Sequence, residues 1–224
     1  MKVIVFGATG MVGQGVLRQC LADPGVEGVL TLGRRATGQK HAKLREIVLL
    51  DLTDYSAISP ELSGFDACFF CLGVTSAGMT EAEYRKVTVD IAVAAGRALA
   101  ERSPQMTFVF VSGQGSDGTG KSRVMWSRVK GEAENAILAM PFKGKFAFRP
   151  GFIRPAPGVV SRTPLYRFFY ALILPLFPLI KALFPRNVTT SETIARAMLN
   201  VARHGAPKAV LETADINAVA GAGS

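Results

Sequence analysis

The chain has 224 residues, 49% of them hydrophobic, which suits one globular domain with a full core and leaves little room for a second independent one. Three cysteines are too few for a disulfide framework, and the N-terminal run MKVIVFGATG lacks the long apolar stretch of a signal peptide, so we expect a cytoplasmic protein. The net charge is +9, and residues 135–191 contain no acidic residue. This imbalance favours an anionic partner (a phosphorylated ligand, nucleic acid or a membrane surface) or else a solvated basic face.

The predicted elements alternate between short apolar strands and helices. Strands are expected at 2–6, 27–32, 46–50, 66–72, 107–111 and 145–148, and helices at 11–21, 80–102 and 123–140. Nearly continuous apolar strands between helices indicate a parallel sheet that is covered on both faces. We therefore expect an α/β fold, a Rossmann-type doubly wound sheet in the order 3-2-1-4-5-6. Residues 1–224 would form a single domain, with 152–205 as a mostly helical substrate-side or lid appendage.

Cysteine and histidine positions do not predict a metal site. Cys68 and Cys71 have CxxC spacing, but both fall in a predicted buried strand, where residues three apart face opposite sides. His41 and His204 are far apart in the sequence, with no cluster of further ligands near either. We expect no bound metal.

The turn between the first strand and the first helix has the spacing G-x-x-G-x-x-G. Gly7 permits a tight turn, Gly10 lets the backbone approach a pyrophosphate, and Gly13 lets the helix pack on the strand. The helix N-terminus then supplies free N–H groups for the phosphates. The pattern predicts a dinucleotide site that includes Gly7, Thr9, Gly10, Met11, Val12 and Gly13.

The end of the second predicted strand indicates which dinucleotide binds. NAD sites have an acidic residue there for the ribose hydroxyls, whereas this chain has Arg34 and Arg35, and no acidic residue occurs between Gly28 and Glu46. A guanidinium forms charge-assisted hydrogen bonds with a 2′-phosphate. We therefore expect NADP(H) in preference to NAD(H).

A second phosphate-binding pattern, G-x-x-x-x-G-K-[ST], occurs at 115–122. It begins beyond the predicted end of the preceding strand, and no apolar strand ending in Asp follows to hold magnesium. A P-loop nucleotide hydrolase therefore stays a distant alternative, beside a flexible Gly/Ser loop next to the active site.

Taken together, the motifs resemble those of the short-chain dehydrogenase/reductase superfamily, in its atypical branch with epimerase-like and Tat-interacting-protein-like members. The resemblance extends to about residue 202. It rests on GATGMVG (7–13), GRR (33–35), Asp51-Leu52, Cys71-Leu72-Gly73, FVFVS (108–112), WSRVKGEAE (126–134) and RPG (149–151).

The resemblance implies roles for further positions. Asp51 and Leu52 would lie beside the adenine, and Leu72 and Gly73 along the adenosine ribose and pyrophosphate. In the catalytic part of the site, Ser112 would lie near a substrate carbonyl and Lys130 would hold the nicotinamide ribose. The segment Arg149-Pro150-Gly151 would close over the cofactor, which adds Pro150 and Gly151 to the expected binding residues.

The chain departs from this family at the catalytic tyrosine. Such enzymes carry Tyr-x-x-x-Lys on one helix face, and the lysine lowers the pKa of the tyrosine that exchanges a proton with the substrate. Here Trp126 stands four residues before Lys130, and its indole cannot transfer a proton near neutral pH. No Tyr-x-x-x-Lys occurs elsewhere in the chain.

Three interpretations of the tryptophan remain. The protein is an NADP(H)-dependent oxidoreductase or epimerase-like enzyme with another proton donor, for which Ser127, Tyr166 and water are candidates. Alternatively it is a non-catalytic NADP(H)-binding sensor or regulator, or Trp126 marks a divergent variant. If the protein is an enzyme, the expected catalytic positions are Ser112, Trp126 and Lys130.

The apolar run 168–180 is bounded by Arg167 and Lys181 and contains two prolines. It is too short for a membrane span, which needs about 20 residues. The segment 165–185 predicts a substrate lid, a peripheral contact with the inner face of a membrane, or a homodimer interface. We expect a small-molecule substrate or none, and no nucleic-acid recognition motif is present.

Overall fold

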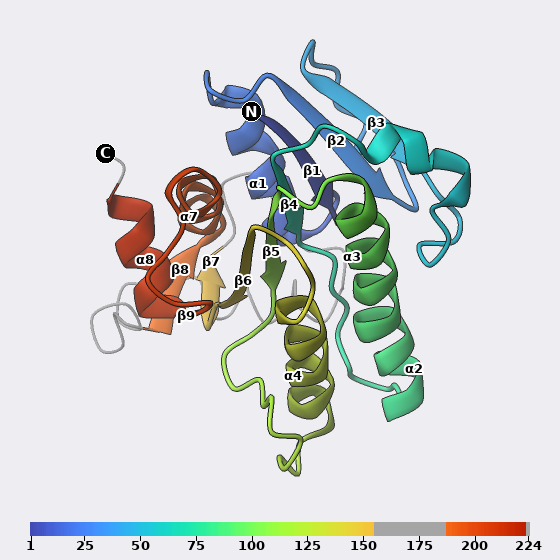
Figure 1. The fold of residues 1–224 in the computed structure, drawn as a ribbon. Coiled ribbons are helices and arrows are strands. Elements are labelled where there is room, and N and C mark those ends of the chain that lie inside the picture. Colours follow the sequence, from blue (N-terminus) through green and yellow to red (C-terminus); the bar gives the residue numbers. More distant parts are fainter. Residues whose placement is uncertain (155–186, 223–224) are drawn as a thin grey trace.

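The central element of the fold is a seven-stranded parallel sheet in the order β3-β2-β1-β4-β5-β6-β9 (Figure 1). The computed structural model describes residues 1–154 and 187–222. The strands of the sheet are β1 (Lys2–Phe6), β2 (Gly28–Gly33), β3 (Leu44–Val48), β4 (Ala67–Phe70), β5 (Thr107–Val111), β6 (Gly144–Arg149) and β9 (Val210–Glu212). The predicted α/β fold and the strand order 3-2-1-4-5-6 are confirmed, with β9 added beside β6.

Helices cover both faces of this sheet (Figure 1). One face carries α1 (Met11–Ala22), α7 (Ser191–His204) and α8 (Thr213–Gly221). The other carries the 3-10 helix η1 (Ser56–Leu62) and the helices α2 (Glu81–Arg85), α3 (Ile91–Arg102) and α4 (Met125–Leu138), with a π-helical stretch, η2 (Lys86–Asp90), between α2 and α3. A separate pair of short parallel strands, β7 (Phe152–Arg154) and β8 (Val188–Thr190), lies beyond the end of β6.

Alternate residues of the central strands enter opposite layers of the core. Val3 and Val5 pack with α1 and α7, whereas Ile4 and Phe6 pack with α3 and α4. The second layer contains stacked or tilted rings of Phe6, Phe70, Phe108, Phe110 and Phe142. Burial on both faces explains why the strands read as continuous apolar runs.

The same alternation separates Cys68 from Cys71. Cys68 is buried in the layer under α3 and α4, whereas Cys71 packs against the layer under α1 and α7. The prediction that the two thiols face opposite sides is confirmed. Over residues 1–154 and 187–222, no group of three His, Cys, Asp or Glu side chains is placed to hold a metal ion.

Some predicted boundaries differ from the structure. The third strand is Leu44–Val48 rather than 46–50, and Leu50 is 92% exposed beyond its end. The fourth strand ends at Phe70 rather than residue 72, and the backbone of Cys71 and Leu72 lies close to Gly7.

The appendage expected at 152–205 is built differently where it is described. Helix α7 is no lid: it packs against α1 and forms part of the core layer. Tyr166 and the apolar segment 165–185 lie outside the described residues. None of the described helices is long and apolar enough to cross a membrane.

A buried ion pair joins α4 to the sheet. The Arg149 guanidinium donates to both carboxylate oxygens of Glu134, with Nε–Oε1 at 2.9 Å and Nη2–Oε2 at 2.5 Å. Glu134 is almost fully buried, and Arg149 also reaches Glu212 on β9 at 3.3 Å. The hydrogen bonds that Arg149 donates to Glu134 raise the pKa of the guanidinium, outweighing burial, so Arg149 stays charged. This contact fixes the helix against the carboxyl ends of β6 and β9.

We expect Glu134→Gln to lower the free energy of unfolding by about 2–4 kcal/mol, because it leaves a partly buried guanidinium without its main partner. Urea denaturation measures the loss. The matched control is Glu132→Gln on the same helix, α4. It breaks an exposed pair with Arg85 of α2 and should cost less than about 1 kcal/mol. Equal losses in the two variants would contradict the role given to Glu134.

Candidate functional site

The glycine turn lies at the carboxyl edge of the sheet, between β1 and α1, and Gly7 and Gly13 are sterically required. Gly7 has a φ of +70°, and a Cβ there would lie 2.7 Å from the backbone of Cys71 and Leu72. A Cβ on Gly13 would overlap the carbonyl oxygen of Gly7. Gly10 N–H donates to that same oxygen at 2.9 Å. The turn is therefore held by backbone contacts that no larger residue permits.

The N-terminus of α1 is open toward the edge of the sheet. Gly10 caps the helix without a side chain, and its first turn holds no acidic residue. The Gln14 side chain donates to Thr9 O at 3.0 Å, which steadies the turn before the helix. The first-turn N–H groups of Met11 and Val12 can thus serve an anion, and the cradle fits a pyrophosphate.

Two arginines follow β2 at the same edge. Arg34 and Arg35 are exposed, and neither guanidinium is bonded to another residue in the part of the chain that the structure describes. Glu46 on β3, by contrast, accepts hydrogen bonds from Thr31 Oγ1 at 3.1 Å and Thr37 N at 2.8 Å. Burial raises the pKa of Glu46, but these hydrogen bonds outweigh burial and lower it. The Glu46 carboxylate therefore stabilises the loop that carries the two arginines through these hydrogen bonds.

The residues expected along the adenosine lie on the neighbouring loops. Asp51 is exposed and accepts from Thr53 N at 2.8 Å and Thr53 Oγ1 at 2.7 Å, so its carboxylate shapes the loop after β3. Leu52 is buried beneath it. Leu72 touches the Gly7 turn. The structure thus gathers these predicted residues around one edge of the sheet.

Lys130 on α4 points toward the end of β4. Its Nζ lies 4.0 Å from the position that a Cβ on Gly73 would occupy, and it donates to Val111 O at 3.4 Å. The ammonium also sits 5.7 Å from the centre of the Phe110 ring. Burial lowers the pKa of Lys130 to about 8, although the Glu134 carboxylate acts in the opposite direction. The lysine is therefore a cation that loses its charge within a biologically accessible pH range.

The hydroxyl groups near Trp126 are engaged within the protein. Ser116 Oγ donates to Gly113 O at 2.8 Å, which leaves Ser112 Oγ to donate to Ser116 Oγ, also at 2.8 Å. Ser127 Oγ donates to Gly115 O at 2.6 Å and is buried. Neither serine has its proton free for a substrate in this arrangement.

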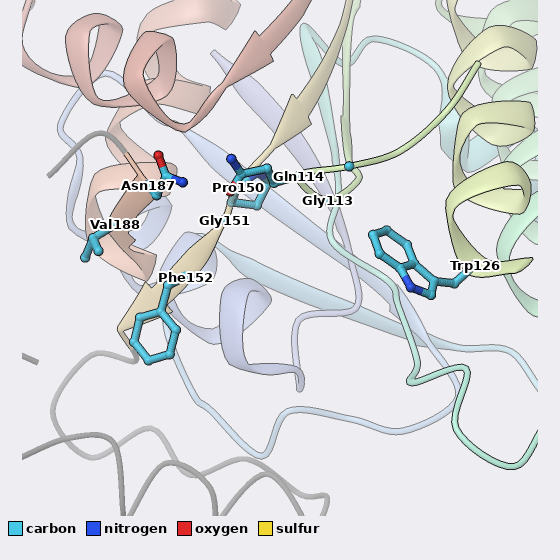
Figure 2. Close-up of a pocket in the computed structure, with 9 residues that line it drawn as sticks. Gly113, Gln114, Trp126, Pro150, Gly151, Phe152, Asn187 and Val188 are labelled. Atoms are coloured by element: carbon cyan, nitrogen blue, oxygen red, sulfur yellow. The ribbon is translucent and has the colours of Figure 1, made fainter. Parts of the chain in front are cut away.

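Trp126 lines a cavity of about 690 Å³ near the carboxyl ends of β5 and β6. Figure 2 shows the indole on one side, Phe152, Asn187 and Val188 on the other, and Gln114, Pro150 and Gly151 between them. The floor is fixed because Gln114 N donates to Pro150 O at 3.0 Å and Gly151 N donates to Thr213 Oγ1 at 2.8 Å. A side chain at Gly151 would overlap the Gln114 amide. The cavity thus has aromatic walls and two amide groups.

Sequence reasoning missed Gln114, Phe152 and Asn187 in this cavity. Gln114 lies two residues after the predicted site residue Ser112, and this closeness in the sequence could have identified it as a residue of the site. Asn187 reaches the cavity because β8 pairs with β7, and this short pairing of distant segments had no visible sequence pattern.

The loop at 115–122 is not arranged as a phosphate cradle. β5 ends at Val111 and α4 begins only at Met125, so Lys121 does not open a helix. The Asp117 carboxylate accepts from Thr119 N at 2.8 Å and Ser122 N at 2.7 Å, and the bonds from Thr119 contribute most to lowering its pKa to about 2. An internal anion therefore occupies the donors that a triphosphate would need.

Comparison with known proteins identifies a family model and relatives that match this chain. The family model described as "NAD dependent epimerase/dehydratase family" matches residues 3–123. The protein fmp52 of Emericella nidulans is 31% identical over 172 residues, covering 70% of this chain and 72% of that protein. Fmp52-1 of Aspergillus terreus is 34% identical over 158 residues, covering 68% and 66%. Both relatives are described as mitochondrial, so the expectation of a cytoplasmic protein is contradicted.

Solved structures share the fold at lower identity. Bordetella bronchiseptica WbmF in complex with NAD+ has a TM-score of 0.72 at 18% identity, covering 98% of this chain and 76% of that one. DesIV, a dTDP-glucose 4,6-dehydratase from Streptomyces venezuelae with NAD and TYD bound, has a TM-score of 0.69 at 16% identity, covering 95% and 75%. With its glycine turn, its sheet order and these matches, the chain belongs to the NAD-dependent epimerase/dehydratase family of nicotinamide dinucleotide-binding Rossmann proteins.

Proposed function

We propose that this protein binds NADP(H) at the carboxyl edge of the sheet and uses it in an oxidoreductase reaction. The observation that carries the proposal is the convergence of the Gly7–Gly13 cradle and the Lys130 ammonium on one edge. The cradle would hold the pyrophosphate, and Lys130 would donate to the nicotinamide ribose hydroxyls. A bound nicotinamide supplies or accepts a hydride.

The preference for NADP(H) over NAD(H) rests on the loop after β2. Arg34 and Arg35 offer two exposed guanidiniums where the adenosine ribose would lie, and a 2′-phosphate would pair with them. Glu46, the nearest acidic residue on the neighbouring strand, is held by Thr31 and Thr37 and supports the loop. No described carboxylate on this loop is left to bind a free 2′-hydroxyl.

A non-catalytic NADP(H)-binding regulator is the second candidate. The observation in its favour is that Trp126 replaces the expected tyrosine while the hydroxyls of Ser112 and Ser127 are both turned inward. Such a protein would bind the dinucleotide and respond to its level without turnover. The two candidates share the dinucleotide site. They differ in whether the protein, with Trp126 in place of the tyrosine, turns over a substrate.

The double variant Arg34→Ala/Arg35→Ala should weaken NADPH binding about tenfold or more and leave NADH binding nearly unchanged, because only NADPH carries the 2′-phosphate. Trp126 is the only tryptophan, so its fluorescence and the thermal stability of the protein report binding. Lys121→Ala is the control, since its loop is not arranged for phosphate. Equal losses of affinity for NADPH and NADH would contradict the assignment of the two arginines to the 2′-phosphate.

NADPH affinity should be nearly steady from about pH 7 to 7.5 and fall up to about tenfold as the pH rises through 8, since Lys130 then loses the charge that attracts the anionic ligand. Titrations of thermal stability at several pH values measure this. Lys130→Met should bind weakly and show no such step. A wild-type profile that stays flat from pH 7 to 9.5 would exclude Lys130 from the cofactor contacts.

Restoring the tyrosine separates the enzyme from the regulator. Trp126→Tyr recreates Tyr-x-x-x-Lys on α4, and general acid catalysis contributes about 10²–10⁴-fold, so NADPH-dependent reduction of saturated carbonyl compounds should rise toward that range. Trp126→Phe is the control, because it supplies a ring without a hydroxyl. No gain across a carbonyl panel, with NADPH binding intact, would favour the regulator.

A further inference from the structure

The described cavity beside Trp126 has no side chain that can transfer a proton near neutral pH. Its lining side chains are aromatic, aliphatic or amide groups, with Trp126 and Phe152 on opposite sides (Figure 2). Ser112 and Ser127 donate within the protein, and Lys130 points to Gly73 and Val111 rather than lining this cavity. Among the residues that the structure describes, a substrate bound here meets no strong acid that could protonate it as it accepts a hydride.

This constraint separates classes of hydride acceptor. Hydride addition to a saturated ketone leaves an alkoxide, which is nearly as basic as hydroxide and needs a proton donor in the transition state. Hydride addition to a quinone leaves a phenolate-type oxygen, whose conjugate acid has a pKa of about 10, as for a phenol. The second anion is weaker as a base by about five pKa units. Water can protonate it after the transfer.

The shape and chemistry of the cavity suit the second class. A volume of about 690 Å³ lies within the range of about 300–1,000 Å³ that is typical of small-molecule sites. The indole of Trp126 offers a flat face for stacking on a conjugated ring, which the ring quadrupole favours in offset geometry. The amide groups of Gln114 and Asn187 can donate hydrogen bonds to carbonyl oxygens, where negative charge develops.

We propose that the substrate of this site is a planar quinone, stacked on Trp126 and bound through its carbonyl oxygens by Gln114 and Asn187. The proposal rests on the proposed NADP(H)-dependent function. The quinone takes a hydride, which is two electrons and one proton, from the reduced nicotinamide as its C4–H bond breaks. One quinone oxygen becomes a hydroxyl, the ring becomes aromatic, and the other oxygen carries the negative charge until water protonates it. The products are oxidised NADP and a hydroquinone.

The experiment uses 1,4-naphthoquinone as the probe and 2-decalone, a saturated bicyclic ketone of similar size, as the comparison. Naphthoquinone should quench Trp126 emission saturably in the protein without dinucleotide, and an excess of 2-decalone should not displace it. Under anaerobic conditions the wild type should oxidise NADPH with naphthoquinone at least about 100-fold faster than with 2-decalone, since only the ketone needs the missing acid.

Variants test the contacts. Trp126→Ala and Asn187→Ala should each weaken naphthoquinone binding, measured as the shift in thermal stability, by about tenfold, while the NADPH-induced shift is retained. The control is Gln39→Ala, which removes an exposed amide from the loop after β2. It should change neither the naphthoquinone-induced nor the NADPH-induced shift in thermal stability.

Two outcomes overturn the proposal in distinguishable ways. If NADPH binds but naphthoquinone neither quenches Trp126 saturably nor oxidises NADPH, the substrate class is wrong and the dinucleotide site stands. If NADPH itself fails to shift the thermal stability, the proposed function fails first. Quinone turnover that is unchanged in both Trp126→Ala and Asn187→Ala places the reaction outside this cavity and also excludes the proposal.

Discussion

The close approach of the backbone at Gly7 and Gly13 is the constraint on which the site depends. Because a Cβ on Gly13 would overlap Gly7 O, and one on Gly7 would crowd the chain at Cys71, the first helix can lie this near the strand ends only without side chains at both positions. This close contact between Gly7 and Gly13 positions the N-terminus of α1 at the carboxyl edge of the sheet. It also brings the end of β4 beside the turn, so that Leu72 and Gly73 continue the same surface.

Helix α4 supplies the other half of the site and is anchored in three ways. Gly131 packs directly on the backbone of Asp117 and Gly118, Glu134 pairs with Arg149 on β6, and Val129 enters the core. The helix held in this way projects Lys130 toward the end of β4 and, from its first turn, Trp126 toward the cavity. The long loop before α4 is likewise held from within, because the Asp117 carboxylate accepts hydrogen bonds from the backbone of Thr119 and Ser122.

Most of the nucleotide-binding half could be predicted because its signals are local. The glycine turn, Arg34 and the strands around it depend on short-range patterns of steric freedom, charge and apolar alternation. The rest could not be predicted, because strands β7, β8 and β9 have three residues each and gain their place only from pairing with distant segments. Asn187 enters the cavity by this route. Helix α7 was assigned to an appendage because nothing in its own pattern says that Ser191 would lie against Gly15 of α1.

The site retains groups suited to dinucleotide binding but lacks, among the described residues, the expected proton donor. This difference bears on which hydride acceptors it can reduce. The groups suited to holding a dinucleotide are open: the first turn of α1, the two arginines and the Lys130 ammonium. Among the described residues, the expected tyrosine is replaced by Trp126, and the hydroxyls of Ser112 and Ser127 donate within the protein. A lysine whose pKa is lowered by burial would ordinarily assist a tyrosine, but here the Lys130 ammonium lies near the carbonyl of Val111 and the ring of Phe110. A site built in this way favours a reaction whose difficult step is positioning a flat acceptor for hydride transfer, with protonation left to water.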